Sequence, residues 1–183
     1  IKKFIRKYNY SIPRNPGLLG TYLGYFIADK VGILTPKTRL IELIVNNKPA
    51  GVYIEIEELG EGFLRKNNIM PVDLYKGATA RRNNKPYIDK NLTSNAILWK
   101  KTAYFNQYAE DNNDRFEYVL DLMSSLRTGE GSYEEFKVIF DIDSWAKYSA
   151  YQVLTQSWHN YESNNLSLIY DHWRGKVIPI SSD

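Results

Sequence analysis

The chain has 183 residues, of which 43% are hydrophobic and 25% charged, a composition typical of a globular domain with one sizeable core. Its 24 basic and 21 acidic residues leave a net charge of +3, which is too balanced to indicate a nucleic-acid-binding protein. No apolar run is long enough to span a membrane, and the absence of cysteine excludes disulfides and thiolate zinc sites. Because the chain opens on Ile1 and stops at Asp183 directly after a predicted strand, we expect a fragment truncated at both ends.

The first predicted element is a helix near residues 18–27. Apolar side chains recur there at helical spacing, at Leu18, Leu19, Tyr22, Leu23, Phe26 and Ile27. Gly32 suits the C-terminal cap of this helix, and Pro36 blocks any continuation.

Two strands follow, at 38–46 and 51–57, and the turn between them is rich in Asn, Lys and Pro. We predict an antiparallel hairpin, in which side chains alternate between the two faces. The face that we expect to be buried carries Val52, Ile54 and Ile56. The opposite face carries Tyr53, Glu55 and Glu57.

Residues 67–92 form a polar stretch around a short predicted strand at 73–76. We place this strand in the same sheet as the hairpin and expect Glu57 and Lys76 to form an ion pair or to line one cleft. Such a pair is one way to position the phosphates of a nucleotide. Taken without other signals, it is more simply a surface salt bridge, worth about 0–1 kcal/mol. The basic run that begins at Arg81 is either a solvated loop or a phosphate clamp, and the loop is the simpler interpretation.

The second half of the chain is predicted to be mostly helical and to end in a hairpin. One apolar stripe is formed by Phe116, Val119, Leu120 and Met123. Asp143 or Ser144 can cap a further helix. Strands are then expected at 166–171 and 177–180, with residues 172–175 turning the chain.

The ends of this late hairpin carry oxygen ligands of the kind that magnesium prefers. Asn164 or Asn165 precedes the hairpin, and Asp183 follows it. Protein kinases hold magnesium with an asparagine and an aspartate, and a closed hairpin brings its two ends together. The alternative is an asparagine-rich loop with an aspartate at a strand end.

In order and spacing, these segments resemble the spore-coat protein H (CotH) kinase family over most of the chain. The resemblance is carried by Val31–Pro36, Val45–Glu57, Phe63-Leu64, Leu74–Gly77, Asn165–Asp171 and Val177–Asp183. It implies an α+β, atypical protein-kinase-like fold that uses ATP and Mg²⁺. In that fold Lys76 and Arg81 would contact phosphates, Glu57 would orient Lys76, and Asn164 or Asn165 and Asp183 would ligate the metal.

The chain departs from this family at two places. The family usually closes on Trp-Asp-x-Asp, whereas this chain has Ile180-Ser181-Ser182-Asp183 and lacks one aspartate. The family also tends to carry an aspartate upstream of the asparagine, as a candidate base, and this chain has none there. His159 or Glu162 is the substitute that we expect to act as the base.

We therefore predict a single kinase-like domain over 1–183, with a sheet-rich lobe over about 1–92 and a helix-rich lobe over about 93–183. The predicted function is ATP-dependent phosphoryl transfer to a serine or threonine hydroxyl of a protein, possible acceptors being serine-rich coat or surface proteins. The alternative is a catalytically weak or inactive relative that acts as a binding module on a spore coat or cell surface. Of the functions that we consider, nucleic-acid binding has the least support from the sequence. The resemblance favours a spore coat, cell surface or secreted location for a bacterial protein.

Overall fold

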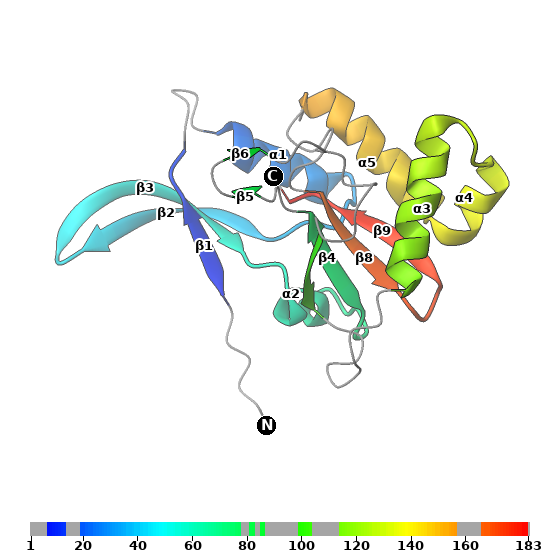
Figure 1. The fold of residues 1–183 in the computed structure, drawn as a ribbon. Coiled ribbons are helices and arrows are strands. Elements are labelled where there is room, and N and C mark those ends of the chain that lie inside the picture. Colours follow the sequence, from blue (N-terminus) through cyan, green and yellow to red (C-terminus); the bar gives the residue numbers. More distant parts are fainter. Residues whose placement is uncertain are drawn as a thin grey trace.

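A computed structural model of the chain contains five helices and three antiparallel sheets in its described part (Figure 1). The structure describes residues 7–13, 19–77, 81–82, 85–86, 99–103, 114–156 and 166–182. The α+β class predicted from the sequence is confirmed. Within these described ranges, no helix combines the length and apolarity needed to cross a bilayer.

The first sheet has three antiparallel strands in the order β1–β3–β2. Its strands are β1 (Tyr8–Ser11), β2 (Thr38–Val45) and β3 (Lys48–Glu57). The predicted hairpin is confirmed, although its second strand begins at Lys48 and not at 51. Asn46 and Asn47 make the turn with φ of 52° and 61°, the conformation in which a two-residue turn matches the twist of the strands. The β2–β3 ribbon extends away from the body of the molecule (Figure 1).

Burial along β3 differs from the expected pattern. Ile54 is 1% exposed, as predicted, but Val52 is 54% exposed and Ile56 is only partly buried. On the other face, Glu55 and Glu57 are 6% and 5% exposed. The expectation was therefore wrong for Val52, because this residue lies on the projecting part of the ribbon, beyond the pairing with β1.

The second sheet has four antiparallel strands in the order β7–β4–β8–β9. Its strands are β4 (Asp73–Gly77), β7 (Trp99–Ala103), β8 (Ser167–Asp171) and β9 (Lys176–Ile180). The late hairpin is confirmed, with Ser167 opposite Ile180. The prediction that Glu57 and Lys76 share a sheet is wrong, because β3 and β4 belong to different sheets. Since β4 pairs with β8, the predicted lobe boundary near residue 92 does not separate the strands of this sheet. A small third sheet pairs β5 (Arg81–Arg82) with β6 (Lys85–Pro86).

Each face of the four-stranded sheet has its own apolar cluster. On one face, Phe63 and Leu64 of α2 (Glu61–Lys66) pack with buried residues of the sheet, which are Leu74, Ala103, Ile169 and Ile180. On the other face, α3 (Asp114–Thr128) and α4 (Tyr133–Ile139) contribute to a second cluster. There the ring of Phe116 stacks on Tyr75 at 3.7 Å between centroids. The sheet is thus covered on both faces, as a two-sided core requires.

The remaining helices, α1 (Gly20–Lys30) and α5 (Ile142–Thr155), confirm two predicted elements but differ in detail. Gly32 takes a positive φ of 76° after α1, as expected for a helix end. The cap of α5 is Asp141, whose carboxylate accepts from Ser144 N at 3.0 Å. The expectation that Asp143 or Ser144 would be the cap is therefore wrong by two or three positions. The sequence could not decide among neighbouring capping residues.

Candidate functional site

Glu57, the predicted partner of Lys76, is a buried carboxylate at the end of β3. Its Oε2 atom accepts from Lys66 Nζ at 2.9 Å and from the backbone N of Lys37 at 3.3 Å. The expected Glu57–Lys76 ion pair is replaced by one with Lys66, a residue that the sequence analysis did not consider. Glu57 therefore ties α2 to the first sheet.

Glu55 lies two residues earlier on the same face of β3 and is also held by a cation. Arg39 Nε donates to Glu55 Oε1 at 2.6 Å, and Arg39 Nη2 donates to Glu55 Oε2 at 3.2 Å. Hydrogen bonding to Glu55, followed by the charge of this carboxylate, raises the pKa of the Arg39 guanidinium. The alternation of β3 indicated that these carboxylates share a face, but their cations come from other elements.

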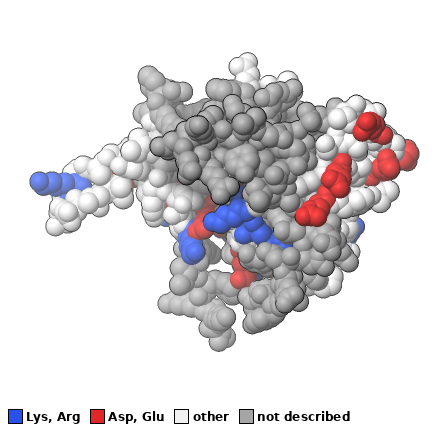
Figure 2. Space-filling model, viewed as in Figure 1, with Lys and Arg blue, Asp and Glu red and all other residues white. Residues whose placement is uncertain are grey.

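Lys76 projects from the middle of the second sheet and is exposed. Its neighbour on β8 is Ser167, which is fully buried and donates from Oγ to Ser182 Oγ at 3.0 Å. The side chain of Ser182 is thereby held next to β8, the strand that pairs with the strand of Lys76. On the face shown in Figure 2, Lys and Arg atoms gather near the middle of the molecule, with Asp and Glu atoms beside them.

Most of the other predicted site residues fall outside the described part of the chain. These are the candidate bases His159 and Glu162 and the candidate ligands Asn164, Asn165 and Asp183. Arg81 is described only in its backbone, which pairs with Pro86. Among the described residues, no group of three or more His, Cys, Asp and Glu side chains is arranged to hold a metal ion. The predicted oxygen ligands are not among those residues, so the magnesium site stays a prediction.

Ser181, which the resemblance aligns with an aspartate of the family, is fully buried in the structure. Its Oγ donates to the hydroxyl of Tyr151 at 3.2 Å, and its backbone N donates to Leu34 O at 3.0 Å. Its carbonyl accepts from Thr35 Oγ1 at 3.3 Å. Ser181 therefore links β9 to α5 and to the segment before β2, which is a packing role.

A second polar cluster, which the sequence analysis missed, surrounds Asp73 on the opposite face of β4 from Lys76. Asp73 Oδ2 lies 2.8 Å from His172 Nε2 and 3.5 Å from Lys101 Nζ, and the Tyr75 hydroxyl donates to it at 3.4 Å. His172 thus has the carboxylate of Asp73 as its partner. No sequence spacing pointed to this cluster, since its members come from two strands, β4 and β7, and from the turn after β8.

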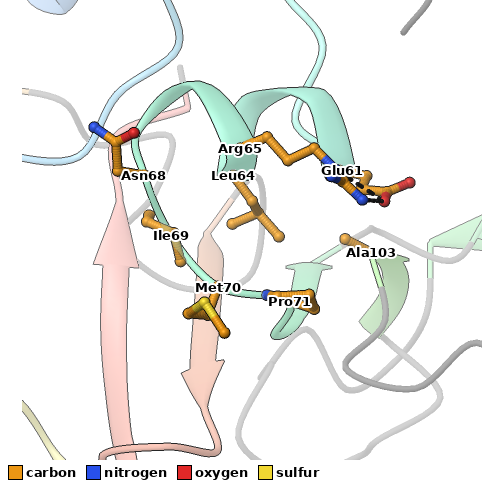
Figure 3. Close-up of a pocket in the computed structure, with 8 residues that line it drawn as sticks. All are labelled: Glu61, Leu64, Arg65, Asn68, Ile69, Met70, Pro71 and Ala103. Atoms are coloured by element: carbon orange, nitrogen blue, oxygen red, sulfur yellow. Dashed lines mark hydrogen bonds and ion pairs between the residues drawn. The ribbon is translucent and has the colours of Figure 1, made fainter. Parts of the chain in front are cut away.

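A cavity of about 400 Å³ lies beside α2 and the segment that follows it (Figure 3). Its lining residues are Glu61, Leu64, Arg65, Asn68, Ile69, Met70, Pro71 and Ala103. At one end, Arg65 Nη2 donates to Glu61 Oε1 at 2.6 Å, which neutralises the two charges in the wall. The remaining wall is mostly apolar, and none of the predicted site residues lines it.

Comparison with known proteins gives one match that covers most of the chain. No curated protein matches this chain. The sequence model of the family described as CotH kinase protein matches residues 11–179, which include the β2–β3 hairpin, the strand of Lys76 and the late hairpin except for Ile180. The match agrees with the resemblance seen in the sequence, and the chain belongs to the CotH kinase protein family.

Proposed function

We propose that this protein transfers the γ-phosphoryl group of ATP to a serine or threonine hydroxyl of another protein. Membership of the CotH kinase protein family supports a kinase-like enzyme. One observation carries the proposal. Lys76 of β4 lies directly opposite Ser167 of β8, and the hydroxyl of Ser167 donates a hydrogen bond to Ser182 Oγ. The described residues next to Asn165 and Asp183 therefore belong to the same end of the sheet as the lysine.

Each residue is proposed for the role that its chemistry suits. Lys76 binds phosphate oxygens as a point charge, and Arg81 adds a further positive charge. Glu57 acts indirectly, because its contact with Lys66 fixes α2 against the first sheet. His159 or Glu162 accepts the proton of the acceptor hydroxyl.

The metal proposed for this site is Mg²⁺, held by Asn164 or Asn165 and by Asp183. Amide and carboxylate oxygens fit this hard cation, and the hydrogen bonds of Ser181 and Ser182 anchor the chain just before Asp183. When bound, Mg²⁺ would neutralise charge on the phosphates of ATP.

The acceptor and the location are proposed from the family alone. A serine-rich coat or surface protein is the proposed acceptor, and a spore coat, cell surface or secreted location of a bacterial protein is the proposed setting. Nucleic acid is not a proposed partner, because the charge of the chain is nearly balanced.

The test is transfer of labelled phosphate from ATP to a serine-rich protein acceptor, with and without Mg²⁺, together with ATP binding by calorimetry. Lys76→Ala should weaken ATP binding by about ten-fold or more, because one charge-assisted contact to phosphate is lost. Asp183→Ala should remove the magnesium dependence of binding. Lys48→Ala is the matched control, since Lys48 is an exposed lysine on the projecting ribbon. Unchanged ATP affinity in both site variants would contradict the proposal.

A second candidate function is a catalytically inactive relative that acts as a binding module on a coat or cell surface. Ser181 favours it, because this residue is committed to packing against Tyr151 where the family usually has an aspartate. If the protein binds ATP but transfers phosphate neither to an acceptor nor to itself, this second function is the correct one.

A further inference from the structure

Lys100 of β7 lies directly opposite Lys76 of β4 in the antiparallel pair. Directly opposed residues in such a pair have their Cβ atoms about 4.5–5.5 Å apart and project on the same side of the sheet. The strands shift register between Leu74 and Tyr75, but this shift does not affect the pairing of Lys76 with Lys100. The sheet thus brings together two lysines that are far apart in the sequence.

Both lysines are exposed, and within the described part of the chain neither side chain makes a hydrogen bond or an ion pair. The next residue of β7, Lys101, projects to the opposite face and is paired with the buried Asp73 at 3.5 Å. Like charges that face each other across two strands destabilise the pair. The sheet therefore keeps a repulsive contact that an anion between the two ammonium groups would relieve.

The surroundings of Lys76 and Lys100 suit the binding of an anion. On the other side of Lys76 lies the hydroxyl-bearing Ser167, and its Oγ is hydrogen-bonded to Ser182. The carboxylate of Asp73 belongs to the opposite face, and Asp171 is at the far end of β8, where its Oδ1 accepts from the turn. Along the described strands of this sheet, no carboxylate is therefore placed to neutralise the two lysines.

We propose that Lys100 and Lys76 together form a binding site for the polyphosphate chain of a nucleotide, in which Lys100 is a binding residue alongside Lys76. Two ammonium groups on adjacent strands match a ligand with several phosphate charges better than a single phosphate. The identity of this ligand as a nucleotide rests on the proposed function, whereas the polyanion site rests on the cross-strand geometry.

The experiment measures binding of inorganic tripolyphosphate by calorimetry, its displacement by ATP, and the melting temperature with and without the ligand. The variants are Lys100→Ala, Lys76→Ala and the double variant, with Lys48→Ala as a control of equal charge loss. We expect Lys100→Ala to weaken tripolyphosphate binding about ten-fold, with a smaller effect on the binding of inorganic phosphate. Without ligand, Lys100→Ala should leave the melting temperature unchanged or raise it, because a like-charge contact is removed. With tripolyphosphate, the rise in melting temperature should be smaller in this variant than in the wild type.

The outcomes separate this inference from the proposed function. Failure of tripolyphosphate to bind the wild type, or equal affinity in Lys100→Ala and wild type, would overturn the inference even if ATP is turned over. Binding that depends on Lys100 and is displaced by ATP, without phosphoryl transfer, would support the site and contradict the enzyme. Binding that depends on Lys100 but is not displaced by ATP would overturn the assignment to a nucleotide.

Discussion

Glu57 shows at the scale of a single residue why a charge is tolerated in the interior. Removing a carboxylate from water is costly unless hydrogen bonds and an opposite charge replace the lost hydration. Glu57 receives both, from Lys66 Nζ and from the backbone N of Lys37. The Glu57–Lys66 ion pair therefore contributes more to folding stability than an exposed salt bridge, because its loss leaves a buried carboxylate without one of its donors.

The first prediction concerns this pair. Lys66→Ala should lower the free energy of unfolding by about 2–3 kcal/mol, since the buried Glu57 carboxylate loses its cation. Urea denaturation followed by tryptophan fluorescence measures the change. The matched control is Lys137→Ala, which removes the partner of Glu134 from a pair whose side chains are 40% and 79% exposed. This control should cost less than about 1 kcal/mol, and equal losses in the two variants would contradict a buried role for Glu57.

At the scale of elements, Asp141 joins the start of α5 to the turn between β8 and β9. Its carboxylate accepts from Ser144 N at 3.0 Å and from Arg174 Nη2 at 2.8 Å. Burial alone would raise the pKa of Asp141, but the hydrogen bonds from Ser144 and Arg174 outweigh it and lower the pKa from its ordinary value of 3.8. One side chain thus caps a helix and fixes it to the late hairpin.

The second prediction follows from the sign of this shift. A carboxylate whose pKa is lowered by folding stabilises the fold at pH above its unfolded value, and this stabilisation is lost as the pH falls through the folded value. Asp141→Asn keeps a capping oxygen but loses the charge, so it should reduce stability near neutral pH. The difference from wild type should shrink below about pH 4, where Asp141 becomes protonated first in the unfolded chain and then, at lower pH, in the folded protein.

Urea denaturation across this pH range measures the difference between the two proteins. Asp143→Asn, also in the first turn of α5, is the control for a general loss of negative charge. A difference between wild type and Asp141→Asn that is the same at neutral and acidic pH would refute the role of the ionised carboxylate.

At the scale of the whole molecule, the four-stranded sheet joins the two halves of the chain. Its central strands are β4 and β8, which are remote in sequence, and each face of the sheet carries an apolar cluster. Neither half can complete this sheet alone. The kinase-like arrangement proposed for the protein therefore depends on contacts between distant segments.

The third prediction is that the chain unfolds in one transition. Tryptophan fluorescence and far-UV circular dichroism should give the same urea midpoint, because disrupting β4–β8 pairing removes the core on both faces of the sheet. Phe116→Ala, which removes a ring stacked on Tyr75, should shift both midpoints together and cost about 3–5 kcal/mol. Two separate midpoints would show that the halves fold independently.

The local elements followed largely from the sequence, because they depend on neighbouring residues. The helix before Gly32, the hairpin around Asn46-Asn47 and the late hairpin were all predicted from periodicity and turn residues, and all are confirmed. The family followed from the order and spacing of such segments. Of the candidate site, the role of Glu57 in phosphate binding stays a prediction, and the sequence predicted the wrong ion-pair partner for it.

What only the tertiary structure decided is which segments meet. Alternation along β3 showed two faces but not how far along the strand they are covered, so Val52 is exposed while Ile54, Glu55 and Glu57 are buried. Pairing between strands placed Lys100 opposite Lys76, and packing of α2 supplied Lys66 to Glu57. The physical reason is that turns, caps and periodicity are encoded over a few residues, whereas sheet order and ion-pair partners depend on the free energy of packing the whole chain.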